Sequence, residues 1–312
     1  MDNLSQFIYT MFWNLKNFRA SPLLLICVIM AMLLVMKYTT REGMTNIPNP
    51  KFQQLVGDAI FTPQYVSIFD TLFRVQEKDN FEVAQVAKFT EMGKDSHVLD
   101  IGCSTGHRAA LLQKVTSSVK GVDSSANMIK KAKRDYPFLD LVVDNIIEPS
   151  KLIDRKLYTH VTVLYFEVYR HKDKHRLFRI LNGMLVPGGK LAVHLVDRNK
   201  FDPIVPAANP IQSVSPQDYA KKRLTRSEVL FNTCSYVASL EEPSHGDNYT
   251  FVETITPKDG GRPTQNRHAL HMPRQKDVLA AARDAGFTIT GRFSLEPVGY
   301  YHNQVYILQK AQ

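Results

Sequence analysis

The apolar residues near the N-terminus first recur at helical spacing and then form an unbroken run. Residues 1–20 carry an apolar side chain at every third or fourth position, which predicts an amphipathic leader lying in a membrane interface. A helix packed on the protein itself, or a disordered leader, is the alternative. The run 23–36 is wholly apolar, and with its flanks it approaches the roughly 20 residues that a membrane-spanning helix needs. Since no small-residue cleavage pattern follows, an uncleaved transmembrane anchor over 21–38 is favoured over a signal peptide.

After residue 58 the apolar runs become short and alternate with stretches of helical spacing. We expect strands at 98–101, 119–122, 139–143, 159–166, 190–196, 288–295 and 303–309, and helices at 107–115, 173–183 and 279–285. Alternating strands and helices are typical of a parallel sheet with helices on both faces. The pattern therefore predicts an α/β domain over 58–312, with a Rossmann-like, doubly wound, seven-stranded sheet.

Two stretches depart from this alternation. Residues 39–57 contain two prolines and little periodicity, which predicts a linker. At about 198–274 the helical spacing lapses, and strand-like runs alternate with turn sequences such as PSHGDN and KDGG. We interpret this second stretch as an antiparallel β insert on the substrate side of the domain.

Charge and cysteine content narrow the setting of the protein. The 312 residues carry a net charge of +9, which favours anionic surroundings, but no arginine-rich tract indicates a specific nucleic acid. Three cysteines without close spacing give neither a disulfide framework nor a zinc site, and no other cluster suggests a metal. Basic residues after the apolar run slightly outnumber those before it. This bias predicts a single-pass membrane protein whose C-terminal domain faces the cytoplasm.

The strongest chemical signal is a small-residue loop between the first buried strand and the following helix. Gly102, Ser104 and Gly106 form this loop, and Asp100 precedes it. Such a loop lets backbone N–H groups approach a ligand closely. A dinucleotide fingerprint would need glycine where Ser104 and His107 stand. The pattern instead suits S-adenosylmethionine, whose amino acid end and sulfonium cation favour a nearby carboxylate.

Polar residues also end the next two strands. Asp123 follows the second strand, where a carboxylate can accept hydrogen bonds from both ribose hydroxyls. Asp144 and Asn145 follow the third strand, in a position to contact an adenine ring. Each aspartate alone is compatible with a turn or a helix cap. Acidic or amide side chains at three successive strand ends favour a shared nucleoside site.

These motifs resemble a known family. The segments VLDIGCSTG, GVDSSANMIKKAK, VVDN and LVPGGKLAVHLVD look like the class I S-adenosylmethionine-dependent methyltransferase superfamily, and most closely like its type 11-like domains. The resemblance implies a methyl-transferring enzyme that uses S-adenosylmethionine. It implies Asp100 and Gly102 near the methionine end, Asp123 on the ribose, Asp144 at the adenine amine, and Tyr65 covering the methionine. The cofactor-binding residues that we predict are Tyr65, Asp100, Gly102, Ser104, Gly106, Asp123, Asp144, Asn145 and Tyr165.

The catalytic candidates follow the fourth strand, whose C-terminal end faces the expected crevice. Methyl transfer is an in-line displacement, so the enzyme mainly orients the reactants, which supplies ~7–11 kcal/mol. A base is needed only when the acceptor must lose a proton. Glu167 and His171 are the predicted groups for that role, although the stretch RHKDKHR around His171 is also compatible with a solvated side chain.

The acceptor cannot be identified from these motifs. A small-molecule or lipid-like acceptor at a membrane is the favoured interpretation. A nucleotide-dependent oxidoreductase and a catalytically inactive cofactor-binding module are the alternatives.

Overall fold

The computed structural model describes residues 52–150, 158–209 and 215–312. The predicted leader at 1–20, the predicted anchor at 21–38 and most of the predicted linker lie outside these described residues. Within the described ranges, no helix combines the length and the apolar character that a bilayer crossing requires.

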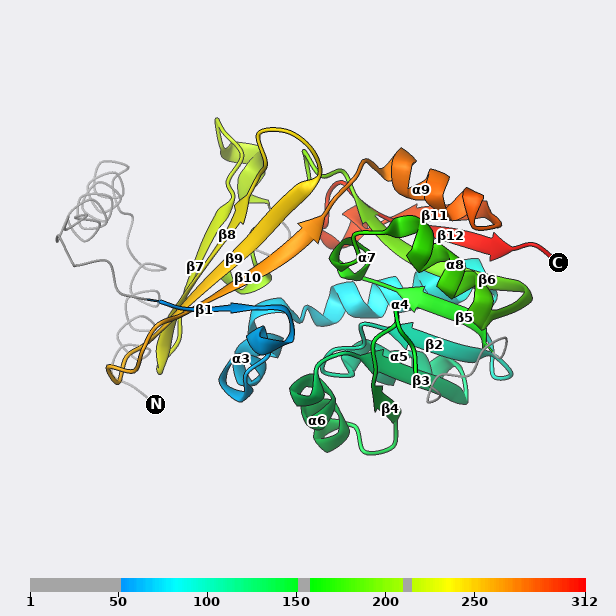
Figure 1. Ribbon diagram of the computed structural model, residues 1–312, viewed down its shortest axis with the longest axis horizontal. Coiled ribbons are helices and arrows are strands. Elements are labelled where there is room, and N and C mark those ends of the chain that lie inside the picture. Colours follow the sequence, from blue (N-terminus) through cyan, green and yellow to red (C-terminus); the bar gives the residue numbers. More distant parts are fainter. Residues whose placement is uncertain (1–51, 151–157, 210–214) are drawn as a thin grey trace, which may run out of the picture. The chain divides into compact units, whose positions relative to one another are not determined.

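A seven-stranded sheet forms the centre of the domain (Figure 1). Its strand order is β11-β12-β6-β5-β2-β3-β4. The strands are β2 (His97–Ile101), β3 (Ser118–Asp123), β4 (Asp140–Val143), β5 (Tyr158–Val163), β6 (Leu185–Val196), β11 (Phe287–Ser294) and β12 (Asn303–Lys310). Every neighbouring pair from β6 to β4 is parallel, whereas β12 runs antiparallel to both β6 and β11. The predicted Rossmann-like α/β architecture is confirmed, with a mixed sheet.

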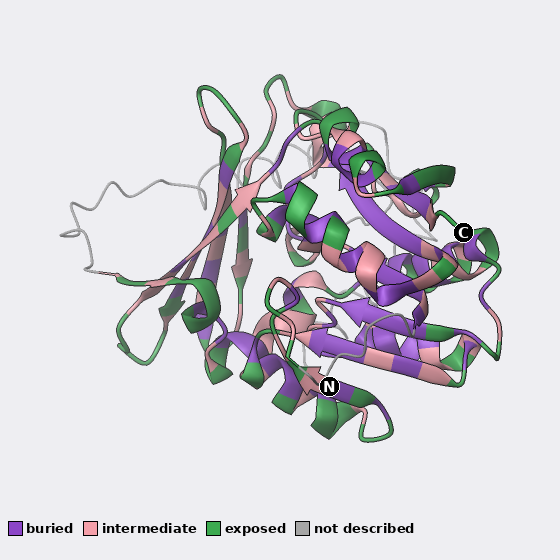
Figure 2. Ribbon diagram, turned by 45° about the vertical axis from the view of Figure 1, so that its right-hand side comes forward, coloured by how far each residue is buried: buried purple, intermediate pink, exposed green. Residues whose placement is uncertain are grey.

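Helices cover both faces of this sheet and bury its apolar side chains. The α-helices are α3 (Pro63–Phe73), α4 (Gln76–Thr90), α5 (His107–Val115), α6 (Ala126–Asp135), α7 (Glu167–Arg170), α8 (Lys174–Met184) and α9 (Gln275–Asp284). Helices α8 and α9 share one core with Leu99 and Ile101 of β2. Helices α4, α5 and α6 share the other core with Val98 of the same strand. Since successive strand residues point to opposite faces, this division follows from the strand period of two, and the central strands are buried (Figure 2).

Several helices begin where the sequence supplies a capping side chain. The hydroxyl of Thr62 accepts a hydrogen bond from Tyr65 N, and Pro63 occupies the first position of α3. Ser125 caps α6 and Asp173 caps α8 in the same way. Each cap satisfies a backbone N–H group that the helix itself leaves free, and typically contributes about 1 kcal/mol.

A second, five-stranded sheet lies beside the first, with strand order β1-β10-β9-β8-β7 (Figure 1). Its strands are β1 (Gln53–Val56), β7 (Arg226–Leu230), β8 (Cys234–Glu241), β9 (Asn248–Pro257) and β10 (Thr264–His271). Strands β7 to β10 pair antiparallel within the stretch where we expect the insert. Short 3-10 helices complete the described elements, namely η1 (Gly57–Ile60), η2 (Pro206–Ala208), η3 (Pro216–Tyr219) and η4 (Glu296–Val298).

The structure differs from the predicted linker at its C-terminal end. Residues 53–56 form β1, which pairs in parallel with Thr264–Arg267 of β10. A four-residue strand has too few residues to show a period of two, and its backbone partner lies some two hundred residues away. For this reason the local sequence gave no sign of it.

Candidate functional site

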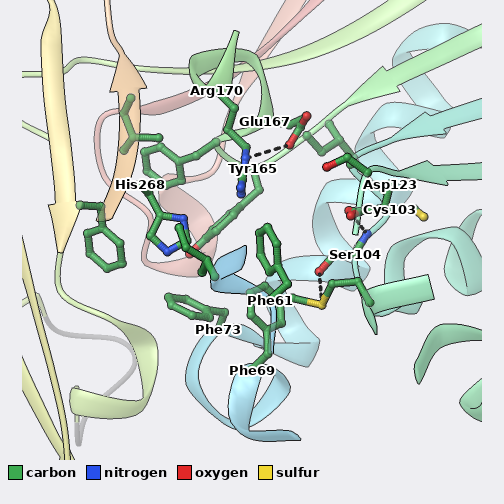
Figure 3. A pocket seen from close by; sticks show the side chains of 18 of the residues that line it. Phe61, Phe69, Phe73, Cys103, Ser104, Asp123, Tyr165, Glu167, Arg170 and His268 are labelled. Atoms are coloured by element: carbon green, nitrogen blue, oxygen red, sulfur yellow. Dashed lines mark hydrogen bonds and ion pairs between the residues drawn. The ribbon is translucent and has the colours of Figure 1, made fainter. Parts of the chain in front are cut away.

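One cavity of about 720 Å³ opens between the C-terminal ends of the parallel strands and the five-stranded sheet. This volume falls in the range typical of small-molecule sites. Of the predicted site residues, the cavity is lined by Tyr65, Gly102, Ser104, Asp123, Asp144, Asn145, Tyr165, Glu167 and His171. Asp100, at the end of β2, and Gly106, the last residue of the loop, are absent from its lining. Nine of the predicted residues thus line one cavity, part of which is shown in Figure 3.

The loop after β2 is held in left-handed conformations. The backbone φ is +67° at Gly102, +53° at Ser104 and +82° at Gly106. A left-handed residue other than glycine costs roughly 1–2 kcal/mol, so the surrounding structure must stabilise Ser104. Ser104 N donates a hydrogen bond to Asp123 Oδ2 at 3.0 Å, and Cys103 N donates to Val122 O. These bonds tie the loop to the end of β3.

Asp123 therefore has a structural partner as well as an open face toward the cavity (Figure 3). Its Oδ1 accepts a hydrogen bond from Ser125 N at 2.8 Å. Burial, reinforced by the nearby Glu167 carboxylate, raises the pKa of Asp123 to about 6. A carboxylate that loses solvent in this way gains from a ligand that donates hydrogen bonds to it.

Asp100 lies deeper, at 1 % exposure. Its Oδ1 accepts a hydrogen bond from Thr162 Oγ1 at 2.7 Å, while its Oδ2 has no hydrogen-bond partner among the described residues. Burial raises its pKa to about 6. Asp100 stays a predicted cofactor residue, although it is not part of the cavity lining.

The loop after β4 is organised around two side chains. Asp144 accepts hydrogen bonds from the backbone and hydroxyl of Ser150, and its Oδ1 also accepts one from Asn145 N. Asn145 Oδ1 accepts a hydrogen bond from Ile147 N at 2.9 Å. Both residues act here as turn residues, and both line the cavity.

The two predicted catalytic residues contact each other. His171 Nε2 lies 3.0 Å from Glu167 Oε1, and Arg170 Nε lies 3.9 Å from Glu167 Oε2. Burial disfavours the charged form of Glu167, but His171 and Arg170 hold its pKa below the ordinary value. A Cβ atom at Gly102 would stand 2.7 Å from the Glu167 side chain. The Glu167 carboxylate is thus placed against the cofactor loop.

A group of buried charges, which our reading of the sequence missed, lies where α4 meets α5. Lys78 pairs with Asp79 and Glu82, and its ammonium stands 5.3 Å from the ring centre of Tyr165. Arg108 reaches the cavity beside them, and its buried Nε has no hydrogen-bond partner in the described structure. Cations with spare donors at a cavity wall suit a carboxylate ligand.

Aromatic rings, of which only Tyr65 was predicted from the sequence, form another part of the cavity wall. We call the residues Phe61, Tyr65, Phe69, Phe73, Phe251 and His268 the aromatic chamber. Neighbouring rings among them have centroids 5.0–6.5 Å apart. All six line the cavity. The Arg170 guanidinium stands 5.0 Å from the centre of Phe61. Such a lining suits an acceptor with a flat apolar part.

Tyr65 joins this chamber to the second sheet. Its hydroxyl donates a hydrogen bond to Glu253 Oε1 at 2.8 Å, and the residue is 2 % exposed. Our prediction that Tyr65 covers the methionine end stays a prediction. The position of Glu253 in the sequence could have indicated this contact. Glu253 alternates with the apolar residues Phe251 and Ile255 on the inward face of β9. A charged residue on such a face indicates a buried polar site.

The part of the chain that holds the loop is similar in sequence to known methyltransferases. Residues 98–189 match the model of a family described as a methyltransferase domain. The chain is 28% identical over 107 residues to a ubiquinone biosynthesis O-methyltransferase of Coxiella burnetii, covering 34% of this chain and 46% of that protein. It is 32% identical over 102 residues to a trans-aconitate 2-methyltransferase of Rhodopseudomonas palustris, covering 32% and 38%. The matched stretch thus spans less than half of these curated relatives.

Solved structures extend the likeness to most of the described domain. The CcbJ methyltransferase from Streptomyces caelestis superposes with a TM-score of 0.60 at 16% identity, covering 82% of this chain and 100% of that one. The amino pentose methyltransferase CalS10 from Micromonospora echinaspora, solved with S-adenosylmethionine bound, gives 0.53 at 16% identity, covering 75% and 92%. At such identities the likeness shows a shared fold.

Proposed function

Since this chain belongs to the class I S-adenosylmethionine-dependent methyltransferase superfamily, we propose that it transfers a methyl group to an acceptor held in the aromatic chamber. The observation that carries the proposal is that one cavity holds both parts of the site. Asp123 and the left-handed loop line it, and the rings of the aromatic chamber line it as well. A methyl donor and an acceptor can therefore meet in one cavity.

The residues of the cavity fit S-adenosylmethionine as the cofactor. Asp123 has the position and the desolvated carboxylate that ribose hydroxyls require. The unpartnered Nε of Arg108, beside Lys78, suits the carboxylate of the methionine end. Glu167, which lies against Gly102, offers negative charge where a sulfonium would stand. When bound, this cofactor supplies a methyl carbon that is already activated for displacement.

The task of the protein is then mainly orientation. The loop is tied to β3, and the acceptor wall is built on α3, β9 and β10, so both parts of the cavity are anchored to regular structure. Holding two reactants in line and excluding water supplies ~7–11 kcal/mol toward the barrier. Within this scheme Glu167 and His171 keep their predicted role in orienting the reactants.

For the acceptor, we propose a small or lipid-like molecule that the protein meets at a membrane. Two considerations support this proposal. The apolar run at 23–36 has the composition of a membrane anchor, and one relative is named as an O-methyltransferase of ubiquinone biosynthesis.

Calorimetry on the full chain tests cofactor binding. We expect S-adenosylmethionine and S-adenosylhomocysteine to bind and NADH to give no heat. Asp123→Ala should weaken binding of S-adenosylhomocysteine by tenfold to a hundredfold, since hydrogen bonds to a charged group contribute about 1.5–3 kcal/mol. The exposed Asp95→Ala, far from the cavity lining, is the matched control. Binding of NADH in preference to the other two would overturn the proposal.

Turnover is tested separately with membrane and soluble extracts. Mass spectrometry should find a product one methyl group heavier with the wild-type chain and none with Asp123→Ala. Cofactor binding without turnover on any fraction would favour an inactive binding module.

A further inference from the structure

Glu253 is a fully buried carboxylate with four hydrogen-bond partners around it. Its Oε1 accepts from the hydroxyls of Tyr65 at 2.8 Å and Tyr236 at 2.6 Å. Its Oε2 lies 2.6 Å from His268 Nε2 and 3.3 Å from Asn266 Nδ2. When each oxygen of a carboxyl group accepts two hydrogen bonds, all four of its lone-pair positions are occupied, and no position is left for a proton. Glu253 is therefore an ionised acceptor, and His268 and the two tyrosines hold its pKa below the ordinary value.

The carboxylate fixes how His268 carries its proton. An ionised Glu253 can only accept, so Nε2 of the imidazole must be the protonated nitrogen. The other nitrogen, Nδ1, then keeps a lone pair, and the described part of the chain shows no hydrogen bond to it. His268 lines the cavity among the rings of Phe61, Tyr65 and Phe251, and Figure 3 shows its side chain in the cavity wall.

A purely structural role explains this arrangement poorly. A buried ionised group with its hydrogen-bond partners seldom adds stability compared with well-packed apolar residues. The Glu253 network joins three strands and α3, and it presents one free basic nitrogen to an aromatic chamber. An imidazole oriented by a carboxylate in this way is a typical proton acceptor in enzymes.

We propose that His268 is the base that takes the proton of a phenolic hydroxyl on the acceptor, and that Glu253 is its positioning residue. This inference rests on the methyl transfer proposed above. The aromatic chamber suits a flat ring, because aromatic side chains stack on or edge against such a ring. A hydroxyl acceptor needs a base, since its oxygen must lose a proton before or during attack. An amine acceptor attacks with a free lone pair and does not need one.

The step balances in atoms and charge. The acceptor oxygen forms a bond to the methyl carbon while the bond from that carbon to sulfur breaks, and the electron pair of the broken bond stays on sulfur. The hydroxyl proton goes to His268 Nδ1, which becomes an imidazolium beside the Glu253 carboxylate. The positive charge that sulfur loses thus appears on the imidazole, and the proton later leaves to water.

The charged and titratable groups around His268 come from several elements. Glu253 of β9 contacts it directly, and Tyr65 of α3 and Tyr236 of β8 bond the same carboxylate. Arg170 of α7 lies over Phe61, a ring that also packs against His268. The ionisation of a phenol bound beside His268 therefore reports on this group as a whole.

A phenol whose ionised form is coloured tests the proposal without knowledge of the natural acceptor. The full chain, saturated with S-adenosylhomocysteine, is titrated with 4-nitrophenol, and the phenolate absorption of the bound probe is followed from pH 5 to 8. We expect the bound probe to ionise at a lower pH than the free probe. His268→Gln should reduce the bound phenolate fraction at least tenfold at the pH where wild type is half ionised, and Glu253→Gln should act in the same direction.

Phe251→Leu is the matched control, because it removes a chamber ring and keeps the base. It should weaken probe binding while the bound probe ionises as in wild type. Equal ionisation in wild type and His268→Gln would overturn the proposal, as would a probe that fails to bind the chain loaded with S-adenosylhomocysteine. If Glu253→Gln fails to fold, His268→Gln alone decides. Failure of S-adenosylhomocysteine to bind wild type would instead sink the proposed methyl transfer.

Discussion

At the scale of single residues, several residues of the site are in conformations or environments that lower the stability of the fold, and the rest of the structure must compensate for them. Ser104 and Tyr165 both have left-handed backbones, with φ of +53° and +58°, and both line the cavity. Asp123 is a carboxylate whose burial opposes its charge. Strained and desolvated groups that cluster in a cavity are typical of functional sites.

The raised pKa of Asp123 predicts pH-dependent cofactor affinity. With a pKa of about 6 in the free protein, Asp123 is mostly protonated at pH 5 and mostly ionised at pH 7. Because ribose hydroxyls bind best to the ionised form, the affinity for S-adenosylhomocysteine should fall by up to tenfold per unit as pH drops below 6. Calorimetry at pH 5, 6, 7 and 8 measures this. Asp123→Asn should bind weakly at every pH, and an equally steep profile in that variant would contradict the assignment.

The raised pKa of Asp100 predicts that the folded protein becomes less stable as pH rises. Its pKa rises from about 4 in an unfolded chain to about 6 in the fold. The folded state therefore holds the proton more tightly, and the free energy of unfolding falls as pH rises through this window. Asp100→Asn avoids that loss while its Oδ1 still accepts from Thr162. At pH 8 it should be more stable than wild type by on the order of 2 kcal/mol in urea unfolding, and at pH 4 it should be nearly equal. A destabilised variant at pH 8 would refute the argument.

At the scale of elements, the sequence predicted what local patterns encode. The strand–loop–helix unit at 98–115 and the polar ends of β3 and β4 combine short-range features, so Asp123, Asp144 and Asn145 could be assigned to one site. The aromatic chamber could not be assigned, because it gathers Phe61 and Phe73 from one segment and Phe251 from a strand that is distant in sequence. Its partners are set by how the second sheet packs, and a single sequence does not show this.

Gly102 offers a test of the loop as an element. An alanine there would keep a φ of +67° only with strain, and its Cβ would stand 2.7 Å from the Glu167 side chain. Gly102→Ala should lower the free energy of unfolding by about 1–2 kcal/mol and weaken S-adenosylhomocysteine binding at least tenfold. Gly93→Ala, where a Cβ meets nothing within 4 Å, is the matched control. Unchanged binding in Gly102→Ala would mean that the loop does not approach the cofactor closely.

At the scale of the whole molecule, the membrane setting stays a prediction from the N-terminal sequence. The full chain should remain with membranes after an alkaline carbonate wash. Ile26→Arg with Met32→Arg should release it, since each arginine near the centre of a span costs about 2.5–3.5 kcal/mol. Asn46→Arg with Asn49→Arg adds the same charges outside the apolar run and should leave membrane retention unchanged. Release of the wild-type chain by carbonate would remove the case for an anchor.

The division of the cavity wall between two sheets has a consequence for how such proteins diversify. The cofactor end is built from β2, β3 and the loops that follow them, whereas His268, Phe251 and Glu253 stand on a separate sheet. Replacements on β9 and β10 can therefore redirect the choice of acceptor without disturbing nucleoside recognition. A lineage that inherits this domain is free to explore new chemistry on one wall while selection conserves the other.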